Sequence, residues 1–169
     1  MNGIRLGIAM AVVSVALVLQ VSLFPHVAWQ GVVPNLCLLV VVAAALTINA
    51  PSAMLLGFAA GVALDLVPPA DHVAGRWALA LTVVAFLAAR VRQDVKPTAT
   101  AVVGTVAAAS FVGTSIFALT GLLLGESGSV PDLLVVIGVA VLWDVLLTPF
   151  VLPPLMRLFG RLDPHLATA

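Results

Sequence analysis

Two aspartates stand inside apolar stretches of the chain, where an ionised side chain is costly. Asp144 has apolar neighbours on both sides, and Asp65 follows an uncharged run that begins at Gly31. A charge in hydrocarbon costs at least about 2.5–3.5 kcal/mol on insertion scales, so such a residue usually has a function or a specific contact. Two carboxylates can share a proton in catalysis, but the expected depths of this pair differ by about 10 Å at helical rise. The sequence therefore predicts no acid pair and no enzyme.

Asp144 has three interpretations. It could relay a proton or an ion, contact another helix of the same chain, or contact a membrane helix of a partner. A relay needs several polar groups along a path, and the apolar stretches offer no second deep carboxylate and no deep base. Pro149 frees the carbonyl of Val145 from its helical hydrogen bond, which predicts a kink beside the acid. We favour helix contact within the chain, then partner contact, then transport.

Asp65 is expected near the outer end of one helix, across a short turn from Arg76 at the start of the next. Opposite charges within a membrane protein usually pair, which favours an ion pair between these two residues. A solvated Asp65 is the alternative.

Gly57 and Gly61 precede this acid on the same stretch and form a GxxxG pattern. The four-residue spacing places both glycines on one helix face, where a second backbone can approach closely. The pattern predicts packing inside the chain or contact with the helix of a partner.

The chain around these residues is too apolar to fold in water. It is 63% hydrophobic and 8% charged, where a soluble domain carries roughly 25% charged residues. A bilayer core of about 30 Å requires roughly 20 apolar residues per helix. The sequence predicts an all-α, polytopic protein with a single integral membrane domain over residues 1–169. Its six transmembrane helices are expected at about 6–24, 33–49, 51–67, 76–91, 98–124 and 133–156.

The basic residues predict the orientation of these helices. With six spans, both termini lie on one side, together with six of the seven basic residues, namely Arg5, Arg90, Arg92, Lys96, Arg157 and Arg161. The other side holds Arg76. Because cytoplasmic loops carry an excess of lysine and arginine, we expect both termini in the cytoplasm.

The short connections, the missing motifs and the net charge exclude several classes of function. The connections between spans are too short to fold into a soluble domain, and no phosphate-binding loop or zinc-ligand spacing is present. The formal net charge is zero, which gives no footprint for nucleic acid. We therefore expect no cofactor, no metal site and no nucleic-acid partner.

Part of the sequence resembles a known family, the rod shape-determining protein MreD family. The resemblance covers about residues 34–90 and is carried by the segments Pro34-Asn35-Leu36, Leu56-Gly57-Phe58-Ala59-Ala60-Gly61 and Leu64-Asp65-Leu66. The turn at residues 48–50 is neutral, where members of the family often carry a basic residue.

The resemblance implies a non-enzymatic subunit of the cell-wall elongation machinery in the bacterial plasma membrane. The implied partner is MreC, a single-span membrane protein, within an assembly that includes RodA, a class B penicillin-binding protein and MreB. The family is similar in fold to the substrate-binding S components of energy-coupling-factor vitamin transporters. The resemblance assigns importance to Gly57, Gly61 and Asp65.

The alternative function is a vitamin-type binding component of a transporter. Such a protein needs polar and aromatic side chains that converge on an outward pocket. The predicted outer loops offer few such residues, and the chain has no tyrosine. This composition favours a scaffold subunit over a small-molecule binder.

Overall fold

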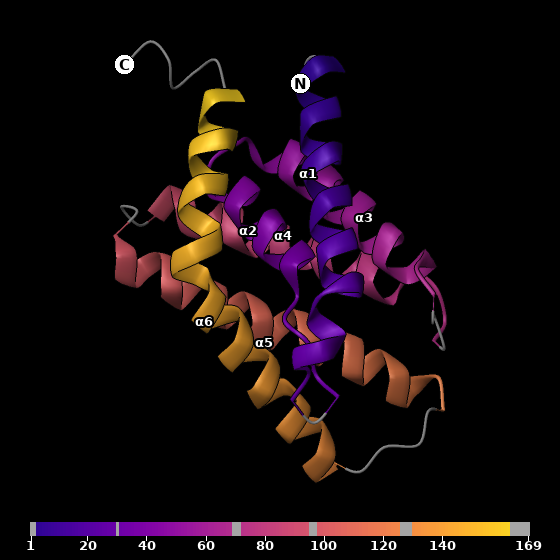
Figure 1. The fold of residues 1–169 in the computed structure, drawn as a ribbon. Helices are drawn as coiled ribbons and strands as arrows, with labels where there is room; N and C mark the ends of the chain where they lie inside the picture. Colours follow the sequence, from indigo (N-terminus) through magenta and orange to yellow (C-terminus); the bar gives the residue numbers. More distant parts are fainter. Residues whose placement is uncertain (1–2, 30, 69–71, 95–97, 126–129, 163–169) are drawn as a thin grey trace.

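The protein is described by a computed structural model covering residues 3–29, 31–68, 72–94, 98–125 and 130–162. Over these ranges it folds into six α-helices and one short 3-10 helix, and the all-α prediction is confirmed (Figure 1). The elements are α1 (Gly3–Ser22), η1 (Phe24–Val27), α2 (Leu36–Ala45), α3 (Ala50–Leu66), α4 (Arg76–Asp94), α5 (Ala99–Leu123) and α6 (Val130–Leu162).

Helix α2 forms the centre of the bundle. Its ten residues are all apolar, and a helix that is apolar on every side must be buried. All ten side chains are indeed buried, and α2 contacts α1, α3, α4, α5 and α6. Figure 1 shows α2 enclosed by the longer helices.

This central helix is shorter than the span expected at 33–49. It begins after Asn35, whose side-chain oxygen accepts a hydrogen bond from the Leu38 amide at 2.9 Å. Just beyond its end, the Thr47 hydroxyl donates back to the carbonyl of Ala43 at 2.7 Å. Ten residues rise about 15 Å, which is half of a bilayer core. A run of apolar residues therefore did not distinguish burial by protein from burial by lipid.

Three helices are long and apolar enough to cross a membrane over the described ranges. They are Arg5–Ser22, Ala99–Leu123 and Pro131–Arg161. Helices α2 and α3 are apolar but shorter, and α4 carries arginines towards both of its ends. The six-span count consequently stays a prediction.

Helix α6 continues past the point where the sequence placed its end. It contains Pro149, Pro153 and Pro154, yet it remains helical to Leu162 rather than ending near residue 156. Leu152 and Phe159, on either side of the proline pair, are both buried in the core. Neighbouring helices can hold a proline-containing helix together in this way, and Figure 1 shows that α6 changes direction along its length.

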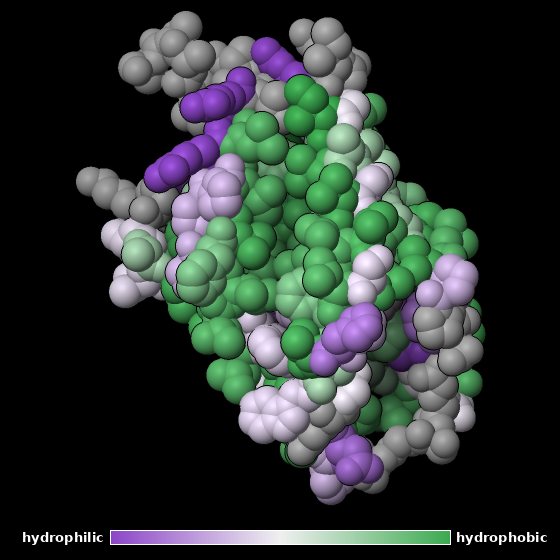
Figure 2. Space-filling view, in the orientation of Figure 1, coloured by the Kyte–Doolittle hydropathy of each residue, from purple (hydrophilic) through white to green (hydrophobic). Residues whose placement is uncertain are grey.

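The start of α1 and the end of α6 lie at the same end of the molecule (Figure 1). Figure 2 shows strongly hydrophilic residues around this end and a broad hydrophobic surface below it. This arrangement is compatible with two termini on one side of a membrane.

Candidate functional site: two buried carboxylates at helix N-termini

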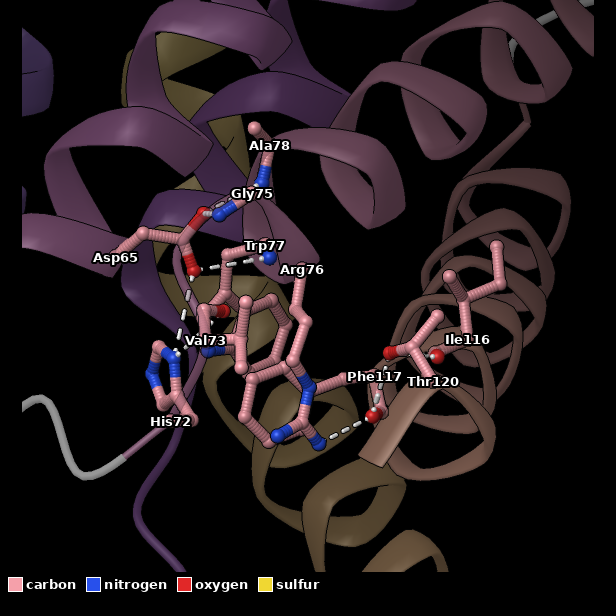
Figure 3. Close-up of polar contacts among 10 residues, drawn as sticks. All are labelled: Asp65, His72, Val73, Gly75, Arg76, Trp77, Ala78, Ile116, Phe117 and Thr120. Atoms are coloured by element: carbon pink, nitrogen blue, oxygen red, sulfur yellow. Dashed lines mark hydrogen bonds and ion pairs between the residues drawn. The ribbon is translucent and has the colours of Figure 1, made fainter. Parts of the chain in front are cut away.

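Asp65 lies at the end of α3 and caps the start of α4. Its side chain is buried, and its Oδ2 accepts hydrogen bonds from the backbone amides of Gly75 at 2.8 Å and Ala78 at 3.1 Å. Its Oδ1 accepts from the amide of Trp77 at 3.1 Å (Figure 3). The first amides of a helix have no partner within the helix and carry partial positive charge. The carboxylate satisfies three of these donors at once and fixes the α3–α4 connection.

Arg76 points away from this carboxylate, towards α5. Its guanidinium carbon lies 3.9 Å from the ring centroid of Phe117, and its Nη2 donates to the Phe117 carbonyl at 2.5 Å. The Trp77 ring stacks on Phe117, with 4.5 Å between the centroids. Figure 3 shows that the two side chains point in different directions: Asp65 points to the amides at the start of α4, and Arg76 points to Phe117 on α5. Arg76 and Trp77 thus attach the start of α4 to α5.

The contacts of Asp65 differ from the ion pair that the sequence suggested. Its hydrogen bonds go to backbone amides, and its nearest titratable neighbour is the His72 imidazole, whose Nδ1 lies 3.8 Å from Oδ1. Backbone amides leave no trace in the residue types of a sequence, which explains why an arginine looked like the natural partner. The usable signal was the position of an acid just before the start of the next helix.

Gly57 and Gly61 face α4 and set how closely it approaches. A Cβ on Gly57 would lie 2.6 Å from the carbonyl oxygen of Leu81, and one on Gly61 would overlap the backbone of Trp77 and Ala78. The structure therefore uses the GxxxG pattern for packing inside the chain. Asp65 follows Gly61 by four residues and lies on the same face, so the two glycines bring its carboxylate to the amides of α4.

Asp144 occupies the corresponding position at the start of α2. It is 1% exposed, its Oδ1 accepts from the backbone amide of Asn35 at 2.8 Å, and its Oδ2 accepts from the Ser110 hydroxyl at 2.7 Å. Gln20 of α1 accepts from the Cys37 amide at 3.3 Å. The carboxylate thereby connects α6 to α2 and α5. Of the three interpretations given for Asp144, this arrangement corresponds to contact with other helices of the same chain.

Pro149 lies five residues after Asp144 and has an exposed side chain. The hydroxyl of the preceding Thr148 donates to the carbonyl of Asp144 at 2.7 Å. The structure thus places Pro149 on the outer side of α6, while Asp144 and Thr148 face inwards.

The other end of α2 receives a positive charge. Arg92, near the end of α4, donates from Nη1 to the carbonyl of Thr47 at 3.2 Å. Cations stabilise helix C-termini, as anions stabilise N-termini. The short central helix therefore has an acid at its positive end and a base just beyond its negative end, each supplied by another helix.

Removing the Asp144 carboxylate should test this assignment. We expect Asp144→Ala to destabilise the bundle by about 2–3 kcal/mol, because it leaves the Asn35 amide and the Ser110 hydroxyl buried without an acceptor. Ser110→Ala should cost about 1 kcal/mol. Thermal unfolding in one detergent should show that the double variant loses about 0.5–1.5 kcal/mol less stability than the two single variants lose together. Strict additivity would contradict the Ser110–Asp144 hydrogen bond.

The fold and these two clusters define an all-helical membrane protein in which buried acidic side chains bind the N-terminal ends of helices. The family model for rod shape-determining protein MreD matches residues 3–159, nearly the whole chain, and the chain belongs to this family. Membership gives it a role in rod shape determination and a place in the membrane. Comparisons with curated proteins and with solved structures returned no match. The likeness to S components therefore stays a prediction.

Proposed function

We propose that this chain is a non-enzymatic membrane subunit of the bacterial cell-wall elongation complex. In this role it binds an MreC-like single-span protein and assembles with RodA, a class B penicillin-binding protein and MreB. One observation carries the proposal beyond family membership. The buried carboxylates contact other helices of the chain, while the outward surface is largely apolar helix. Such a surface suits lateral contact with other membrane helices.

The exposed surface offers comparable positions on four helices. Phe58 on α3, Phe86 on α4, Phe111 on α5 and Phe150 on α6 are all exposed. Lipid tails are as apolar as these side chains, so helix association in a membrane depends on close packing and shape. Partner binding should therefore involve one part of this surface and leave the others in lipid.

Photocrosslinking at these four positions tests the proposal and finds the binding face. Each phenylalanine is replaced in turn by p-benzoylphenylalanine, which preserves the aromatic ring, in cells that express the single-span partner. We expect crosslinks to that partner from one or two of the four positions. The buried Phe159, which is 1% exposed, is the control and should give none. Absence of partner crosslinks from all four positions would count against the proposal.

Depletion of the chain tests the cellular role separately. We expect rod-shaped cells to become round, because the elongation complex would lose a membrane subunit. Cell width and length, measured by microscopy, provide the readout. Unchanged shape together with lost uptake of a vitamin would favour the transporter alternative.

The proposed orientation has six crossings and both termini in the cytoplasm. The common end reached by α1 and α6 supports it, as does the distribution of basic residues. Helix α2 alone is too short to cross, so α2 would have to be continued by the turns at its ends. A reporter fused after the last residue should be active only in its cytoplasmic form, and an externally active fusion would contradict this layout.

A further inference from the structure

A deep apolar groove runs between α1 and α6, and α2 forms its floor. Its volume is about 440 Å³. Figure 2 shows this hollowed hydrophobic face below the hydrophilic end of the molecule. The residues that define it are Ile8, Val15 and Leu19 on α1, Leu36 and Val40 on the floor, and Leu155 on α6.

The shape of the groove selects a slender occupant. Leu36 and Val40 on its floor are only 6% and 2% exposed, so the opening above them is narrow. A helix with its side chains is about 10–12 Å wide and would rest on the rims. A single hydrocarbon chain is narrow enough to enter.

The groove follows most of the apolar part of α1. From Ile8 to Leu19 the α1 wall rises about 16 Å, and it begins about one turn after Arg5 and ends about one turn before Ser22. A single acyl chain can lie along this wall, starting from the end of the groove next to Arg5.

A positive charge lies at the mouth of the groove. Arg5 precedes Ile8 by three residues and Val12 by seven, so it lies on the groove side of α1. The side chain of Arg5 is partly exposed, and the structure shows no ion pair for it among the residues described. A guanidinium at this position is complementary to a phosphate at the membrane surface.

We propose that this groove binds an anionic phospholipid, with one acyl chain along α1 and α6 and its phosphate at Arg5. In the orientation proposed above, the lipid belongs to the cytoplasmic leaflet, whose anionic lipids attract basic residues. The bound chain would fill the space between α1, α2 and α6 and complete the packing of the bundle there.

Two variants separate the acyl-chain contact from the charge. Ala11 lines the groove, and Ala11→Phe would fill it without changing any charge. Met10→Phe is the matched control, because Met10 is exposed and lies away from the groove. For the charge, Arg5→Gln is compared with Arg157→Gln. Arg157 is exposed and lies two residues past Leu155, about 200° around the helix from the groove.

The experiment places the purified full-length chain in vesicles that contain phosphatidylglycerol with a diazirine near the middle of one acyl chain. After illumination, mass spectrometry measures labelling of the groove peptides of α1 and α6. We expect Ala11→Phe to reduce this labelling at least fivefold and Arg5→Gln to reduce it about fivefold. The second figure corresponds to about 1 kcal/mol per basic residue near an anionic surface. Met10→Phe, Arg157→Gln and Arg5→Lys should label like the parent chain.

Three results would overturn the proposal. The first is equal labelling of the groove and the other lipid-facing helices in every variant, which means bulk lipid only. The second is equal labelling by a zwitterionic phosphatidylcholine probe, which excludes recognition of the anionic headgroup. The third is a crosslink from position 11 to a partner's transmembrane helix together with loss of lipid labelling, which identifies a helix as the occupant.

Discussion

Gly61→Ala should prevent the bundle from folding stably, whereas Gly104→Ala should leave it intact or slightly more stable. A Cβ on Gly61 would overlap backbone atoms of Trp77 and Ala78, which cannot move without separating α3 from α4. Overpacking of this kind typically costs about 1–3 kcal/mol, and a rigid backbone neighbour places this site at or above the upper end. Thermal unfolding and the yield of monodisperse protein in detergent measure the effect.

Gly104 is the matched control because it lies within α5 and has open space where a Cβ would be added. Alanine is favoured over glycine inside a helix by about 1 kcal/mol, so the same substitution should change sign between the two positions. Gly57→Ala should resemble Gly61→Ala, since its Cβ would meet the carbonyl of Leu81. Equal melting temperatures for the Gly61 and Gly104 variants would contradict the close α3–α4 contact.

This packing changes how variants of the GxxxG pattern should be used. A double replacement of Gly57 and Gly61 by leucine would separate α3 from α4, and any loss of partner binding would follow from loss of the fold. The exposed phenylalanines test partner binding more directly because their replacement leaves the core unchanged.

Helix positions followed from the sequence because apolar runs and their breaks are local features. The expected break between the spans at 33–49 and 51–67 falls at the observed start of α3, where Asn49 is the cap and accepts from the Ser52 amide at 3.0 Å. The start of α4 at Arg76 also agrees with the predicted boundary. These signals act within a few residues of the chain, so no tertiary information was needed.

The length of α2 and the partners of the acids could not be predicted in the same way. Hydropathy gives the same value whether an apolar residue faces lipid or another helix, so the ten buried residues of α2 resembled part of a full span. The Asn35 amide lies 109 positions from Asp144, and only the fold brings the two together. Asn35 itself was a readable signal, since asparagine before an apolar run is a common helix cap.

The two acids share a physical role that explains why carboxyl groups are tolerated inside this bundle. Asp65 accepts from three amides at the start of α4, and Asp144 accepts from the Asn35 amide at the start of α2. The backbone already carries partial positive charge at both places. The cost of burying the carboxylate is thereby offset by donors that would otherwise be unsatisfied. The GxxxGxxxD spacing of residues 57–65 then has a single explanation. The two glycines let α4 pack closely against α3, and this close packing places the carboxylate of Asp65 at the start of α4.

Asp65→Ala should be the most damaging replacement of a polar residue, at about 3 kcal/mol or more. It removes the acceptor of three backbone amides at the start of α4, in a site that is 3% exposed. Asp65→Asn should recover part of this loss. Its amide oxygen can serve Gly75 and Ala78 from the Oδ2 position, but its NH2 group would then face the Trp77 amide, donor against donor.

The control for this prediction is Thr98→Ala, which removes an exposed N-cap at the start of α5, whose hydroxyl accepts from the Ala101 amide at 3.2 Å. Its effect should be small, because water can solvate the amides of an exposed helix start. Hydrogen exchange in detergent micelles gives a local readout. The amides of residues 75, 77 and 78 should lose protection in Asp65→Ala and keep part of it in Asp65→Asn. Unchanged protection of these three amides in the alanine variant would show that the Asp65 carboxylate does not cap α4.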